Sequence, residues 1–225
     1  MDVVTLYSTK GGCGKTTLAA HLAVEAGKQG AGSVAVIDAD PQASLARWWN
    51  SREAKTPAFV HTTLAGMPSQ LVKLREAGVK LVVIDTPGAD VSHSRGIIRL
   101  SDLVVIPSRP SPLDLGTLGS TVSAVEEEGK PLIFVLNAVT ARTRISAQAI
   151  LALSQHGPVG AILHQRTDYA ASMTDGRVAA ELDPTSKSAE EVAELWRNLL
   201  ASLRKRSRKE VGASTKKSSL KDAVA

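Results

Sequence analysis

The chain has 225 residues, of which 43% are hydrophobic and only 3% aromatic, and its formal net charge is +5. This length suits one doubly wound domain with a substantial core, and the single cysteine, Cys13, excludes an internal disulfide framework. No apolar run approaches the ~20 residues that cross a membrane, and the N-terminus leads into a strand rather than a secretory signal. We therefore expect a cytoplasmic protein that does not use a membrane as partner.

The first predicted strand, residues 3–8, runs directly into a glycine-rich segment that opens a predicted helix over 15–29. Glycines let backbone N–H groups turn toward phosphate oxygens without a Cβ in the way, and a helix N-terminus favours anions. In such a loop Lys15 reaches the β- and γ-phosphates and the Thr16 hydroxyl ligates Mg²⁺. The predicted phosphate ligands within one chain are Gly11, Gly12, Cys13, Gly14, Lys15, Thr16 and Thr17.

This loop departs from the common phosphate-loop pattern at two neighbouring positions. Thr9 stands where the pattern has its first glycine, and Lys10 adds a second lysine to the loop. Two interpretations of Lys10 remain open: a solvated loop lysine, or a cation offered to a nucleotide held by a second copy of the chain.

Carboxylates follow the next two strong apolar runs. Residues 34–38 end in Asp38-Ala39-Asp40-Pro41-Gln42, and residues 80–85 end in Asp85-Thr86-Pro87-Gly88. Buried parallel strands deliver such side chains to the ligand edge of a sheet. Between these runs we expect helices over 43–54 and 67–77 and a weaker strand over 58–62. The structural alternative is that each Asp caps a helix.

The rest of the chain continues the alternation of strands and helices. We expect strands at 103–107, 132–137 and 159–163 and helices at 91–100, 113–129, 144–156 and 188–206. This order predicts an α/β, doubly wound, mostly parallel sheet with helices on both faces, and it places the motifs on one edge of the sheet. The folded domain should cover residues 1–206, with a basic, disordered tail over 207–225.

The glycine loop, the Asp-x-Asp-Pro-Gln segment and the apolar run ending in Asp85 together resemble the ParA family of deviant Walker-type partition ATPases. Residues 101–107 and 110–114 are similar to the small plasmid-encoded, ParF-like members. The resemblance covers roughly residues 2–205. It implies a weak, Mg²⁺-dependent ATPase whose two subunits hold two ATP molecules between them.

The resemblance also implies a role for individual residues. Thr16, Asp38 and Asp85 would serve the Mg²⁺ site, and Asp40 would orient or activate the attacking water. Lys15 would contact the phosphates, and Lys10 would act from the partner subunit on the developing phosphate charge. Asn137 matches the place where the family meets adenine, with the loop at residues 164–168 beside it.

The charge is concentrated at the end of the chain. Residues 204–225 carry a net charge of +6, which leaves residues 1–203 at −1. Nonspecific DNA is the expected partner of this segment, through Arg204, Lys205, Arg206, Arg208 and Lys209. The alternative is a tail that serves only solubility.

The resemblance predicts an ATP-dependent partition ATPase, in a bacterium and associated with the nucleoid. It would segregate a plasmid or chromosome with a ParB-like or ParG-like centromere-binding protein. The alternative is a ParA-like factor that positions or recruits a protein cargo, as in conjugation or chemotaxis. A third interpretation is a ligase of the dethiobiotin synthetase type, which the doubled lysine disfavours.

Overall fold

The computed structural model describes residues 1–88 and 91–222, with side chains described for residues 1–88 and 94–207. Its seven strands form one sheet in the order β3-β2-β4-β1-β5-β6-β7, and all of the pairs are parallel. The strands are β1 (Asp2–Leu6), β2 (Val34–Asp38), β3 (Ala58–Phe59), β4 (Leu81–Asp85), β5 (Leu103–Ser108), β6 (Leu132–Val139) and β7 (Val159–His164).

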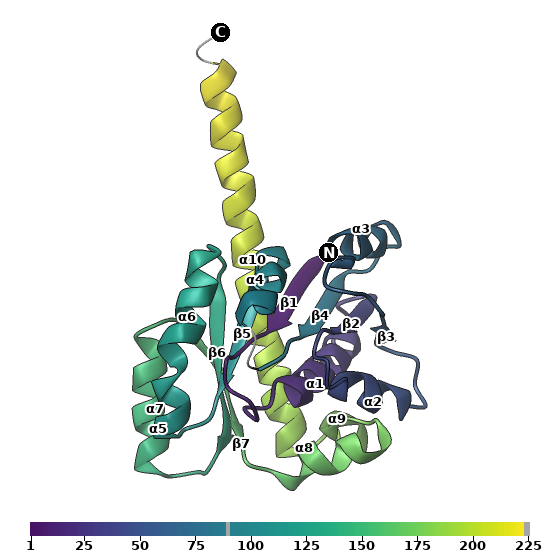
Figure 1. Ribbon diagram of the computed structural model, residues 1–225, viewed down its shortest axis with the longest axis vertical. Helices are drawn as coiled ribbons and strands as arrows, with labels where there is room; N and C mark the ends of the chain where they lie inside the picture. Colours follow the sequence, from purple (N-terminus) through teal and green to yellow (C-terminus); the bar gives the residue numbers. More distant parts are fainter. Residues whose placement is uncertain (89–90, 223–225) are drawn as a thin grey trace.

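Helices fill the connections between the strands (Figure 1). They are α1 (Lys15–Lys28), α2 (Ser44–Asn50), α3 (Met67–Glu76), α4 (Val91–Leu100), α5 (Pro112–Gly116), α6 (Leu118–Glu127), α7 (Arg144–Ser154), α8 (Thr167–Ser172), the 3₁₀ helix η1 (Met173–Asp175), α9 (Ala179–Leu182) and α10 (Lys187–Asp222). The predicted parallel sheet between helices is confirmed.

Strand periodicity divides the core into two layers, because successive side chains point to opposite faces. Val4 and Leu6 pack with α1, α2 and α10 on one face. On the other face Val3 packs in the cluster that includes α3, and Tyr7 packs in the cluster that includes α6 and α7. Both layers are needed to bury the central strands β1 and β4.

Three parts of the chain differ from the sequence prediction. The helix expected over 113–129 is two helices, which meet at Thr117. Short helices α8, η1 and α9 occupy residues 167–182, where no element was expected. The two-residue strand β3 is shorter than the predicted 58–62.

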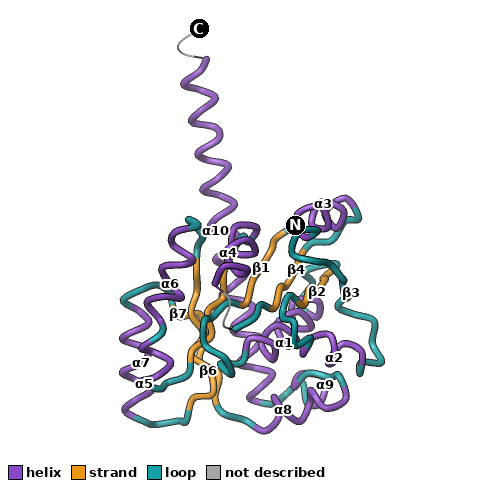
Figure 2. Tube along the Cα trace, viewed as in Figure 1, coloured by secondary structure: helices purple, strands orange, loops and turns teal. Residues whose placement is uncertain are grey.

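The last helix, expected over 188–206, extends further along the chain. The backbone of α10 continues to Asp222, and its last part extends away from the sheet and its helices (Figures 1 and 2). Residues 207–222 contain no proline and one glycine, so the backbone there is compatible with helix although it has little apolar surface to bury. The domain boundary at residue 206 stays a prediction.

Candidate functional site

The phosphate loop joins β1 to α1 at the carboxyl edge of the sheet. Gly12 and Gly14 have φ of 74° and 99°, the left-handed region that favours glycine, and α1 begins at Lys15 without a side-chain cap. The Lys15 side chain is buried at the loop, and its Nζ donates to the Lys10 carbonyl at 3.3 Å. The loop therefore combines a cation with the uncapped N–H groups of a helix N-terminus, which is an anion-binding arrangement.

Thr16 and Asp85 meet beside this loop. The Thr16 hydroxyl donates a 2.6 Å hydrogen bond to Asp85 Oδ2, while Asp85 Oδ1 is buried with no hydrogen-bond partner among the described residues. Burial raises the pKa of Asp85 to about 7, and neighbouring Asp38 adds to the rise while Thr16 opposes it. An unpaired buried carboxylate oxygen next to a hydroxyl fits a hard divalent cation such as Mg²⁺.

The described residues contain no group of three or more His, Cys, Asp or Glu side chains arranged to hold a metal. A Mg²⁺ site of one carboxylate and one hydroxyl would depend on water and nucleotide phosphates for its other ligands. Mg²⁺ is commonly bound in this way, because it dehydrates reluctantly.

Asp38 ends β2 and Asp40 lies in the loop between β2 and α2, and both make local hydrogen bonds. The two carboxylate oxygens of Asp38 accept from the backbone N–H of Asp40 at 3.0 Å and of Ala46 at 2.9 Å. Asp40 Oδ1 accepts from Gln42 N at 2.9 Å. Asp38 thus shapes the loop and the start of α2, as the structural alternative expected. Its role near Mg²⁺ and the role of Asp40 toward water stay predictions.

Gly88 brings the loop after β4 against the phosphate loop. A Cβ built on Gly88 would lie 3.3 Å from Lys15 Nζ and 3.3 Å from Gly11 Cα. Glycine at this position therefore leaves room for the Lys15 ammonium between the two loops. In the sequence Gly88 ends the Asp85-Thr86-Pro87-Gly88 segment, and no sequence pattern indicates this role.

Lys10 is partly exposed at the loop. Its backbone N–H donates to Ser8 Oγ at 3.2 Å, and its ammonium has no hydrogen-bond or ion-pair partner in the part of the chain that the structure describes. Both interpretations of Lys10 require such a side chain, so a contact with a second copy stays a prediction.

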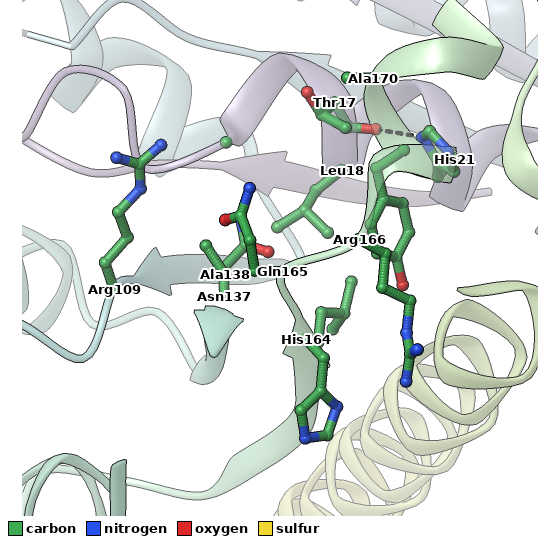
Figure 3. A pocket seen from close by; sticks show the side chains of 13 residues that line it. Thr17, Leu18, His21, Arg109, Asn137, Ala138, His164, Gln165, Arg166 and Ala170 are labelled. Atoms are coloured by element: carbon green, nitrogen blue, oxygen red, sulfur yellow. Dashed lines mark hydrogen bonds between the residues drawn. The ribbon is translucent and has the colours of Figure 1, made fainter. Parts of the chain in front are cut away.

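A cavity of about 200 Å³ lies beside the N-terminus of α1, between the ends of β6 and β7 (Figure 3). Asn137 lies in this cavity, and its Nδ2 donates to the Cys13 carbonyl at 2.8 Å. A Cβ on Gly14 would come within 2.2 Å of that nitrogen. Asn137 therefore braces the phosphate loop, and its predicted contact with adenine is untested.

Several residues that line this cavity were not predicted from the sequence. They include Arg109, which follows β5, Tyr169 on α8 and His21 on α1. Burial lowers the pKa of His21 to about 4, so the ring is neutral: Nδ1 donates to the Thr17 carbonyl at 2.8 Å and Nε2 accepts from Ala179 N at 3.1 Å. No sequence pattern indicated these residues, because tertiary packing alone joins their segments.

The predicted DNA-binding residues do not share one environment. Arg204 and Lys205 are exposed on α10, whereas Arg206 forms an ion pair with Asp102. Asp102 also accepts a hydrogen bond from Val3 N at 2.8 Å, so this ion pair joins α10 to the body of the protein. The side chains of Arg208 and Lys209 lie outside those that the structure describes. Among the described helices, none is both long and apolar enough to cross a membrane.

A parallel sheet with a phosphate loop and a buried aspartate at its carboxyl edge defines a nucleotide-binding protein of the P-loop class. The sequence profile of the CobQ/CobB/MinD/ParA nucleotide binding domain matches residues 4–178. The chain therefore belongs to this family of ParA/MinD-type ATPases, and the resemblance found in its motifs is confirmed.

Three known proteins illustrate the similarity. The maintenance of carboxysome distribution protein A of Gloeobacter kilaueensis is 42% identical over 123 residues, covering 53% of this chain and 55% of the relative. Protein ParA of Rhizobium radiobacter is 33% identical over 132 residues, covering 57% and 59%. The structure of apo McdA from Cyanothece superposes with a TM-score of 0.71 at 20% identity, covering 87% of this chain and 99% of that one. The chain thus matches little more than half the length of these curated relatives.

Proposed function

We propose that this protein is a Mg²⁺-dependent ATPase that closes into a homodimer on binding ATP and acts as a switch for moving or positioning a cargo. The observation that carries the proposal is the buried, unpaired Oδ1 of Asp85 beside the Thr16 hydroxyl and the phosphate loop. Bound Mg²⁺ would supply charge neutralisation at the phosphates.

The side chains divide the work of hydrolysis. Lys15 and the loop N–H groups hold the phosphates, and Thr16 and Asp85 hold Mg²⁺. Asp40 orients the attacking water, and Lys10 of the partner subunit stabilises charge on the transferred phosphoryl group. Turnover is slow, because a switch must persist long enough to transmit its state.

The dimer binds nonspecific DNA through the basic end of α10, which associates the protein with the nucleoid. Two copies double the positive charge, so DNA affinity depends on ATP and falls steeply with salt. A centromere-binding protein of the ParB-like or ParG-like kind stimulates hydrolysis and releases the dimer, and a plasmid or chromosome is segregated as a result.

The test is the mass of the protein in solution with a non-hydrolysable ATP analogue and Mg²⁺, combined with phosphate release. We expect the analogue to double the mass and ATP to be hydrolysed slowly, with stimulation by DNA and partner together. A monomer in the presence of the analogue, or no hydrolysis under any of these conditions, contradicts the proposal.

A second candidate function is the positioning of a protein cargo by the same ATPase switch. It is supported by the 42% identity to a relative named for carboxysome distribution. Deleting the gene discriminates the two: loss of a plasmid at division favours partition, whereas a protein assembly that loses its regular spacing favours positioning.

A further inference from the structure

Glu191 lies in the first turns of α10, beside the loop that connects β7 to α8. Its carboxylate accepts hydrogen bonds from His164 and Arg166, the residues on either side of Gln165. His164 donates through its backbone N at 3.1 Å and Nδ1 at 2.8 Å, and Arg166 through Nε at 3.1 Å and a terminal nitrogen at 2.7 Å. Tyr169 adds its hydroxyl at 3.0 Å. One carboxylate thus holds both ends of the loop between β7 and α8.

Between His164 and Arg166 lies Gln165, whose side chain points into the cavity next to Asn137 (Figure 3). In the same view the Arg166 guanidinium points away from Gln165, toward the turns of α10. Gln165 N also donates to the Val139 carbonyl at 2.9 Å. Its amide therefore faces the cavity because the residues on both sides are held by Glu191.

Glu191 itself is firmly placed. The next residue, Val192, is 2% exposed, and Leu195 is fully buried in the core cluster under α10. Burial alone would raise the pKa of Glu191, but the hydrogen bonds from Arg166 and His164 outweigh it and hold the pKa below its ordinary value. The group is consequently a carboxylate at neutral pH, able to accept all of these hydrogen bonds.

We propose that Glu191 is a positioning residue for the nucleoside part of the bound nucleotide: by holding His164 and Arg166 it sets Gln165 in the cavity wall and links that wall to α10. The inference rests on the proposed binding of ATP. It predicts that Glu191 contributes to the affinity for nucleotides and not to the affinity for phosphates alone.

The experiment is calorimetric titration of the full chain with ATP and with inorganic tripolyphosphate, each with Mg²⁺. Glu191→Gln keeps the size of the side chain but places an amide where only acceptors fit. We expect ATP affinity to fall about tenfold, as for the loss of charged hydrogen bonds, while tripolyphosphate affinity stays within about twofold of the wild type. Glu190→Gln is the matched control: the Glu190 side chain forms an exposed ion pair with Lys187, and its substitution should leave both affinities unchanged.

The outcomes distinguish failure of the proposed function from failure of the proposed role of Glu191. If the wild-type protein binds no ATP, the proposed function fails. If it binds ATP and Glu191→Gln binds it equally well, or loses ATP and tripolyphosphate in parallel, the role of Glu191 is overturned. Should Glu191→Gln not fold, Arg166→Gln removes two of the same hydrogen bonds from a partly exposed side chain and must show the same selective loss of ATP affinity.

Discussion

The hydroxyl of Thr16 donates a 2.6 Å hydrogen bond to the carboxylate of Asp85, which lies 69 residues further along the chain. Parallel pairing of β1 with β4 sets Leu6 opposite Asp85, so the end of β4 lies beside the loop that follows β1. The hydrogen bond occupies one carboxylate oxygen and leaves the other buried without a described partner. Thr16 and Asp85 together therefore form a candidate cation site.

The first prediction concerns pH. Burial raises the pKa of Asp85 to about 7, so the nucleotide-free native state holds a proton that the unfolded state releases near pH 4. This group's contribution to stability is therefore fully present below about pH 4 and is lost progressively as the pH rises from there to about 7. Mg²⁺ requires the ionised carboxylate, so affinity for Mg²⁺-ATP should rise about tenfold between pH 6 and 8.

Calorimetry at the two pH values measures this effect. The phosphates of the nucleotide titrate in the same pH range. The Asp85→Asn variant keeps an acceptor for Thr16 but has no ionisable group, so the pH dependence of its affinity comes from the phosphates alone. An identical pH dependence in the wild type and in Asp85→Asn would show that Asp85 is not the titrating group.

The second prediction separates the two lysines of the phosphate loop. Lys15→Ala removes the cation buried at the loop and should abolish measurable nucleotide binding. Lys10→Ala removes an ammonium with no partner among the described residues, so ATP binding should persist while dimer closure and hydrolysis are impaired. Titration, solution mass and phosphate release make the comparison. Unchanged turnover in Lys10→Ala would remove the proposed action in the partner subunit.

The third prediction concerns the ion pair between the buried Arg52 and the partly buried Glu181. The Arg52 side chain is 2% exposed, and it also donates to the carbonyls of Thr56 and Gly176. Arg52→Ala leaves these acceptors unpaired and should lower the free energy of unfolding by about 3–5 kcal/mol. Urea unfolding measures it.

Arg177→Ala is the control for this prediction, because its ion pair with Asp175 is half exposed and should contribute at most about 1 kcal/mol. Similar losses of unfolding free energy in both variants would mean that the burial of Arg52 does not decide how much its ion pair stabilises the fold.

The fourth prediction concerns the basic segment. Deleting residues 207–225 removes a net charge of +3 and keeps the Arg206–Asp102 ion pair that joins α10 to the body. We expect weaker retention on DNA at low salt and a shallower dependence on salt, with ATP binding unchanged. Retention assays at increasing salt measure this. Equal retention by the truncated protein would move the DNA site to the folded body.

Much of the fold could be predicted from local sequence. The apolar runs that end in Asp38 and Asp85 form strands at the predicted places, because strands of a parallel sheet are buried on both faces and therefore read as short continuous apolar runs. The elements that were missed, α8, η1 and α9, are short and depend on tertiary contacts: Ala179 N donates to His21 of α1. Such contacts leave no periodic signal in the sequence.

The sequence by itself determined the phosphate loop, the order of the acidic motifs and the parallel sheet, because each depends on glycine geometry, strand burial or strand order, which are local properties of the chain. Only the tertiary structure decided that Asp38 accepts a hydrogen bond from Ala46 N in α2, that Asn137 braces the phosphate loop and that Glu191 holds the β7–α8 loop. These roles join residues that meet only when the strand ends and helices are packed together. Their hydrogen bonds depend on distances that no spacing along the chain encodes.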